Sequence, residues 1–76
     1  RQELIKVLHT KLESARITLR KIREEVRANV DIQEEHGSIS EDQKYKLHEE
    51  IEKIGKEANE KIKEIGEEKE AEILKV

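Results

Sequence analysis

Apolar residues recur along this chain at intervals of four and three, and this spacing restricts the possible folds more than any other feature. In the first half the repeat comprises Leu4, Leu8, Leu12, Ala15, Leu19, Ile22, Val26 and Val30. In the second half it comprises Leu47, Ile51, Ile54, Ala58, Ile62 and Ile65, and Ile73 and Leu74 follow near the end. Because an α-helix turns once every ~3.6 residues, this spacing places each set along one side of a helix. The sequence therefore predicts two long amphipathic helices.

The composition is compatible with two states, a pair of long helices or a disordered chain. Charged residues make up 46% of the chain, and Tyr45 is its one aromatic residue. Such a polar composition is typical of disordered segments, whereas the absence of proline and the abundance of Glu, Lys, Ile and Leu are typical of coiled coils. Disordered chains do not keep an apolar repeat in phase over about eight turns, so the periodicity decides in favour of helices.

The segment between the two repeats carries the signals of one helix end followed by one helix start. Gly37 suits the left-handed conformation in which many helices end. His36 precedes it, where a positive charge would meet the negative end of the helix dipole. Ser40 is predicted to be an N-cap, and Gln43 three residues later completes a capping box.

These signals predict one all-α domain over residues 1–76, with a helix over about 2–36, a turn at 37–40 and a helix over about 41–75. A turn this short makes the two helices antiparallel neighbours. Two helices shield only one side of each apolar stripe. We therefore expect an antiparallel helical hairpin that is part of a three-helix bundle, or that dimerises to form four helices.

Four arginines, here called the arginine stripe, follow one side of the first predicted helix beside its apolar residues. They are Arg16, Arg20, Arg23 and Arg27. At about 100° per residue they lie within a sector of roughly 60°. Residues 1–36 carry eight basic and seven acidic residues (net +1), whereas residues 37–76 carry eight basic and twelve acidic residues (net −4). Because a guanidinium group binds phosphate through two parallel hydrogen bonds, the stripe indicates a contact with an RNA backbone.

An ordinary solvated helix surface is the alternative interpretation of the arginine stripe. Arg20 is placed to pair with Glu24, and Arg27 with Asp31, four residues later in each case. Such pairs are common on exposed helices. On spacing alone this interpretation is favoured, because runs of charged residues are usually solvated.

The sequence shows no pattern typical of an active site, a metal site or a cofactor site. His9, His36 and His48 have no metal-ligand spacing, and a surface position is predicted for each. His48 and Glu52 lie four residues apart, but two such groups do not make a site. A chain without cysteine has no disulfide and no zinc–thiolate site, and no glycine-rich phosphate loop precedes a helix. We therefore expect a binding protein that is not an enzyme and has no metal or cofactor.

The longest apolar run is only two residues, as at Leu4-Ile5, so neither a transmembrane span nor a signal peptide is predicted. The absence of cysteine favours a reducing compartment, and a cytoplasmic location is expected.

Gly55 and Gly66 lie inside the second helix, where each costs about 1 kcal/mol relative to Ala. They are eleven residues apart and so share one side. Either another backbone approaches closely there, or the glycines are neutral changes; the sequence leaves both interpretations open.

Two separated motifs resemble those of a known family. The run from Ala15 to Arg23, Ala-Arg-Ile-Thr-Leu-Arg-Lys-Ile-Arg, resembles the Ala-Arg-x-x-x-Arg-x-(Ile/Val)-Arg signature of bacterial ribosome recycling factors. Ile39-Ser40-Glu41-Asp42 resembles the Ile-Ser-Glu-Asp that opens the last helix of that family. The runs 1–4 and 69–74 fit the same alignment without a gap. The resemblance covers all 76 residues but only the C-terminal part of the family's chain.

The resemblance implies that the chain forms the second and third helices of a three-helix bundle. The first helix of that bundle would cover the side of the apolar stripes that two helices leave open. The resemblance also implies a non-enzymatic translation factor that binds the post-termination ribosome and, with elongation factor G and GTP, separates the subunits. The β-rich domain that meets elongation factor G has no counterpart here. Family members place the bundle against large-subunit ribosomal RNA, through arginines that match Arg20 and Arg23. Both side chains are therefore expected to be exposed and free of buried partners. Arg16 matches a nearby basic position, and Arg27 extends the stripe.

The coincidence of the arginine stripe with the family's RNA contact reverses the preference for a solvated surface. Glu24 departs from the family pattern, in which a second arginine is frequent, and its carboxylate would repel phosphate.

The absent initiator Met and the start at Arg1 suggest a fragment of a longer chain. The alternative hypothesis is a structural or engineered antiparallel coiled coil that self-associates. Irregular residues count against an idealised design, namely Thr18, Asn29, Asp31, Gly55 and Gly66.

Overall fold

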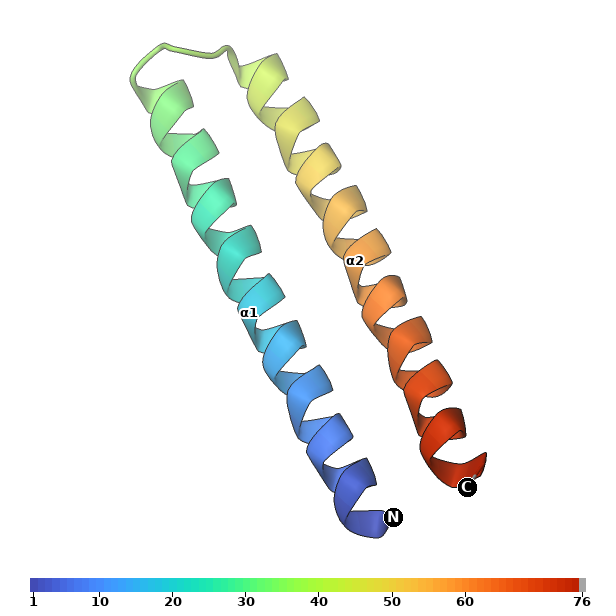
Figure 1. The fold of residues 1–76 in the computed structure, drawn as a ribbon. Helices are drawn as coiled ribbons and strands as arrows, with labels where there is room; N and C mark the ends of the chain where they lie inside the picture. Colours follow the sequence, from blue (N-terminus) through green and yellow to red (C-terminus); the bar gives the residue numbers. More distant parts are fainter. Residues whose placement is uncertain (76) are drawn as a thin grey trace.

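The computed structural model describes residues 1–75 as two long helices joined by a short turn. α1 spans Gln2–Glu35 and α2 spans Glu41–Lys75. The helices lie side by side and antiparallel, so the start of α1 and the end of α2 meet at one end of the molecule (Figure 1). The extents of 57 × 16 × 9 Å describe a thin, elongated slab. The predicted all-α hairpin is confirmed; Val76, which the prediction included, lies outside the described residues.

The end of α1 is closed by two hydrogen bonds that cross over the last turn. Gly37 has a φ of 77°, and its backbone N–H donates to the Glu34 carbonyl at 3.0 Å. The N–H of Ser38 donates to the Gln33 carbonyl at 2.9 Å. This pair of bonds, with glycine in the left-handed conformation, satisfies carbonyls that the helix end leaves free. α1 ends one residue earlier than predicted because His36, with φ −81° and ψ −3°, serves as the C-cap.

The start of α2 carries the predicted capping box. The backbone N–H of Ser40 donates to Gln43 Oε1 at 2.8 Å, and the backbone N–H of Gln43 donates to Ser40 Oγ at 3.1 Å. Two N–H groups that the first turn would otherwise leave unpaired are thus satisfied reciprocally. Glu41 and Asp42 occupy the first turn, where negative charge stabilises the helix dipole.

Replacing Ser40 with Ala is expected to lower the free energy of unfolding by about 1 kcal/mol, because the cap on α2 is lost. Urea denaturation followed by circular dichroism measures this change. Ser38→Ala is the matched control, since only the backbone of Ser38 takes part in the turn. Equal losses from the two substitutions would contradict the capping role of Ser40.

The side of α1 that faces α2 is not centred on the predicted apolar stripe. The half-buried and buried residues of α1, which mark the contact line, are Ile5, Leu8, Leu12, Arg16, Leu19, Arg23, Arg27, Val30 and Glu34. Among the described residues, only Val30 is a buried apolar side chain, at 8% exposure. Three arginines therefore lie at the contact between the helices, and part of the apolar stripe does not.

The part of the apolar stripes that α1 and α2 do not cover is here called the apolar face. It comprises Leu4, Ala15, Ile22 and Val26 of α1 and Ile54 and Ile65 of α2. Ile22 is 52% exposed and Ile54 is 62% exposed. These two side chains, with Val26, also border an apolar groove of about 190 Å³ between the helices. The hairpin thus leaves one apolar side open, whereas the arginine stripe runs along the contact line and, at Arg20, beyond it on the other side.

The two glycines of α2 make room for side chains of α1. A Cβ atom added at Gly66 would lie 2.7 Å from Leu12 Cδ1, and one added at Gly55 would lie 3.3 Å from Arg23 Cδ. The interpretation that another backbone approaches these glycines is therefore wrong for this hairpin. Their value is that long side chains of α1 can lie across α2 at these two points.

Candidate nucleic-acid interface

The side of the slab that carries the arginine stripe, here called the arginine face, also carries the polar contacts between the helices. α2 contributes His48, Glu52 and Glu70 to these contacts. His9 of α1 lies 3.7 Å from Glu70 near the open end of the hairpin. Near the turn, Lys44 lies 3.1 Å from Glu34, and this hydrogen bond raises the pKa of the Lys44 ammonium.

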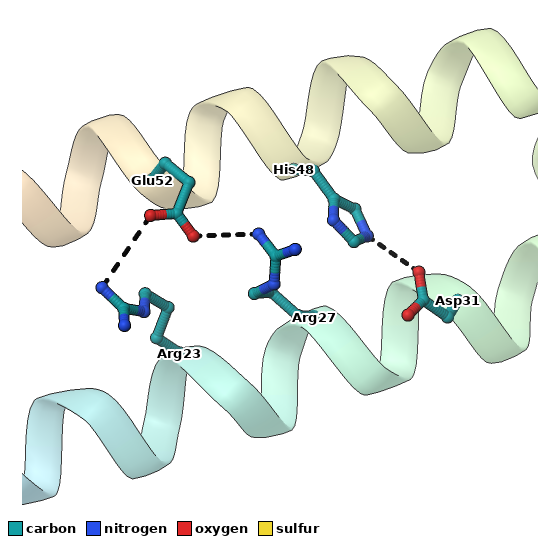
Figure 2. A network of polar contacts seen from close by, with 5 residues as sticks. All are labelled: Arg23, Arg27, Asp31, His48 and Glu52. Atoms are coloured by element: carbon teal, nitrogen blue, oxygen red, sulfur yellow. Dashed lines mark hydrogen bonds and ion pairs between the residues drawn. The ribbon is translucent and has the colours of Figure 1, made fainter.

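Glu52 of α2 bridges two arginines of the stripe. Arg27 Nη1 donates to Glu52 Oε1 at 2.9 Å, and Arg23 Nη1 lies 3.8 Å from Glu52 Oε2 (Figure 2). The predicted pairing of Arg27 with Asp31 is wrong, because Arg27 lies at the α1–α2 contact and reaches across it. One carboxylate thus partly neutralises two guanidinium groups that are one helical turn apart.

Asp31 bonds instead to a histidine of α2. His48 Nε2 lies 2.8 Å from Asp31 Oδ1, next to the Glu52 bridge (Figure 2). Because an ionised carboxylate only accepts hydrogen bonds, this contact requires a proton on Nε2. His48 therefore does not pair with Glu52, although the two lie four residues apart on α2.

Arg23 is the residue for which the sequence-based expectation fails most clearly. It was expected to be exposed and free of buried partners, but its side chain is only 31% exposed and its Nε is buried without a hydrogen-bond partner. The cause is Gly55, whose missing side chain lets the Arg23 stem lie against α2. Only the outer end of the guanidinium group remains available to a ligand.

Arg16 and Arg20 form the half of the stripe that makes no ionic contact with α2. Arg20 is exposed, and the contacts of the described residues include no ionic partner for it. The predicted pair with Glu24 does not form. Arg16 has a single ionic contact, to Glu13 at 3.7 Å on the same helix. These two side chains are therefore the ones that an anionic ligand meets with the least competition.

An open groove of about 360 Å³ lies between the helices at this half of the stripe. Its lining residues are Arg16, Leu19, Arg20 and Arg23 of α1 and Asn59, Glu60 and Lys63 of α2. We call it the central groove. The contribution of α2 has no signal in the sequence, because only the pairing of the helices determines which of its residues face the arginines.

Other kinds of site find no support in the part of the chain that the structure describes. No group of three His, Asp or Glu side chains there is arranged to hold a metal ion. None of the described helices is long and apolar enough to cross a membrane. The chemistry that the arginine face offers is the binding of anionic groups by exposed guanidinium and ammonium groups.

Comparison with known proteins relates residues 1–74 to the family described as ribosome recycling factor. The ribosome-recycling factor of Heliobacterium modesticaldum is 38% identical over 77 residues, and that of Sulfurovum sp. strain NBC37-1 is 37% identical over 76 residues. Each match covers 100% of this chain and 41% of the relative. The factor of Lactobacillus delbrueckii subsp. bulgaricus is 34% identical over 74 residues, which are 97% of this chain and 40% of the relative. The chain thus spans about two fifths of the length of these relatives, and no solved structure matches it.

Proposed function

The chain belongs to the ribosome recycling factor family, and on that premise we propose that it is the RNA-contacting helical part of a translation factor. In this proposal Arg16, Arg20, Arg23 and Arg27 bind the backbone of large-subunit ribosomal RNA during recycling of the ribosome. The observation that carries it is the arginine stripe itself, four guanidinium groups along one side of α1, of which Arg20 is exposed and the other three are half-buried. A merely solvated surface would not require the arginines to be concentrated there.

The geometry favours contacts to phosphate over contacts to bases. Phosphate contacts position a protein on RNA through charge and hydrogen bonds, without base specificity. Guanidinium groups supply both, and a helix holds them at fixed intervals. Arg20 and Arg16 are the most available, whereas Arg23 and Arg27 share the Glu52 carboxylate. We therefore assign the strongest RNA contacts to the half of the stripe nearer the open end.

The direct test is binding of the chain to ribosomes, titrated across salt concentration. If the arginine stripe contacts three or four phosphates, the logarithm of the binding constant should fall with log salt at a slope of about −2 to −4. A slope near zero would show that few phosphates are contacted and would contradict the proposal.

Replacing Glu52 with Gln is expected to strengthen ribosome binding by a few-fold and to steepen the salt dependence by up to about one unit. The bridge is exposed, and such ion pairs contribute at most about 1 kcal/mol to stability, so phosphate can replace the carboxylate. Glu57→Gln is the control, because it removes the same charge from the same helix at an exposed position that borders no groove with an arginine. Equal effects from the two changes would show that the Glu52 bridge does not restrain Arg23 and Arg27.

Self-association is a second candidate function, and the apolar face favours it. Leu and Ile side chains that neither helix covers are expected to pack against a second copy when the chain is alone. The resulting homodimer would have four helices. This candidate is compatible with the first, because Arg16 and Arg20, the more available arginines, do not border the apolar groove.

A further inference from the structure

The polar contacts across the arginine face follow one register. Three of them join residues whose numbers sum to 79, namely 9 with 70, 27 with 52 and 31 with 48. Each joins a basic or imidazole side chain to a carboxylate. In an antiparallel pair a constant sum means that the residues lie opposite each other, so the helices hold this alignment from the open end to the turn.

The same register places Arg16 opposite Lys63, and there the charges do not complement each other. Both side chains border the central groove and the adjoining groove toward the open end, which agrees with this placement. Among the contacts of the described residues, none pairs Lys63 with a carboxylate. Like charges that face each other across two helices repel, whereas α2 carries Glu opposite His9 and Arg27 in the same register, at positions 70 and 52.

The central groove as a whole is positively charged. Arg16, Arg20, Arg23 and Lys63 border it together with a single carboxylate, that of Glu60. Glu13 and Glu52 contact Arg16 and Arg23 from outside the lining, and counting them leaves a net charge of +1. Asn59 adds a neutral amide donor between the two helices. A groove of this charge binds an anion that relieves the repulsion between its walls, and its polar donors suit the oxygens of a phosphate group.

We infer that the central groove is a phosphate-binding site to which α2 contributes Lys63. This inference rests on the proposed function and deepens it, because it names a phosphodiester group of the RNA as the occupant. Arg16 and Arg20 approach that group from α1 and Lys63 approaches it from α2. The RNA contact therefore belongs to the helix pair, not to the arginine-bearing helix alone.

The test compares Lys63→Ala with Lys53→Ala in ribosome binding by the full chain. Lys53 is on the same helix but borders a different surface, with Lys46, Glu49 and Glu50. Lys63→Ala should weaken binding about fivefold at 0.15 M salt and lower the salt slope by about one, the effect of one lost phosphate contact. Lys53→Ala should change neither.

Lys63→Glu separates a ligand contact from a structural role. It places a carboxylate opposite Arg16, but also three and four residues from Glu60 and Glu67 of α2, where like charges destabilise a helix. The change is therefore made both with Arg16 present and with Arg16→Ala. Its effect on the melting temperature should be more favourable by roughly 2–4 °C when Arg16 is present, while ribosome binding in the folded chain falls further than in Lys63→Ala. An effect on the melting temperature that is the same with and without Arg16 would contradict the juxtaposition.

The remaining outcomes distinguish this inference from the proposed function. If Lys63→Ala binds like Lys53→Ala while loss of Arg20 and Arg23 weakens binding, the groove site is wrong and the arginine contact stands. If none of these substitutions weakens binding, both proposals are wrong. Inorganic phosphate added to the chain provides the last comparison: protection of the melting temperature by phosphate that requires Lys63 supports the site, and equal protection in Lys63→Ala overturns it.

Discussion

Replacing both Arg20 and Arg23 with Ala is expected to weaken ribosome binding about 20-fold at 0.15 M salt, because two phosphate contacts are lost and each adds about 0.7–0.9 to the salt slope. The slope should fall by nearly two units. Replacing both with Lys should restore only part of the affinity, since a point charge cannot reproduce the two parallel hydrogen bonds of a guanidinium group.

Because the Arg23 stem lies against Gly55, its removal affects packing as well as charge. The variant that combines Arg20→Ala with Arg23→Met keeps an apolar stem there and removes only the charge. It should bind as weakly as the double-alanine variant and melt at a higher temperature. Lys53→Ala serves as the control on the other helix. Binding of the double variant at the level of this control would reduce the arginine stripe to a solvated surface.

Replacing Val30 with Asp is expected to destabilise the hairpin by about 3 kcal/mol or more, which for so small a domain means loss of the fold. Val30 is the most buried apolar side chain described, and a carboxylate there would lose most of its hydration in the contact between the helices. Circular dichroism and thermal melting measure the effect. A chain that keeps its helical content and melting temperature would show that packing around Val30 does not hold the helices together.

Val26→Asp is the matched control, four residues earlier on the same helix and 43% exposed on the apolar face. It should leave the helices intact but abolish self-association, so sedimentation should report a monomer. Val30→Asp and Val26→Asp thus separate the contact within the hairpin from the contact between copies. A chain that is already monomeric at micromolar concentration would contradict the homodimer.

The features that depend on local sequence were predictable. The apolar repeat specifies the helices, Gly37 ends the first, and Ser40 with Gln43 begins the second, because each signal acts within one or two turns. The direction from which α2 approaches was not predictable. An apolar stripe shows which side of a helix is apolar. Two neighbouring helices can each pack against part of that stripe, so its centre need not face either of them. For this reason Ile22, which belongs to the apolar stripe, is exposed and does not lie at the contact between the helices.

The candidate site divides in the same way. The arginine stripe follows from spacing within α1, whereas the Glu52 bridge and the position of Lys63 depend on contacts between residues 25 to 47 positions apart. The register of the helices determines those contacts, and the turn sets that register. Only the contact between Arg23 and Gly55 had a sequence signal, a glycine inside a helix, and that signal alone does not name the side chain that fills the space.

The apolar face and the arginine face lie on either side of the contact between the helices, with Arg23 bordering a groove of each, so each face offers a surface to its own ligand. Each ligand nevertheless requires the same paired helices. When only a fraction f of the chains has its helices paired, the apparent Kd of the arginine face is the intrinsic Kd divided by f. A ligand that covers the apolar face raises f and so raises the apparent affinity for RNA. By linkage, bound RNA raises the affinity of that ligand by the same factor. The two faces are therefore coupled through the folding equilibrium of the hairpin, without any movement of one helix relative to the other.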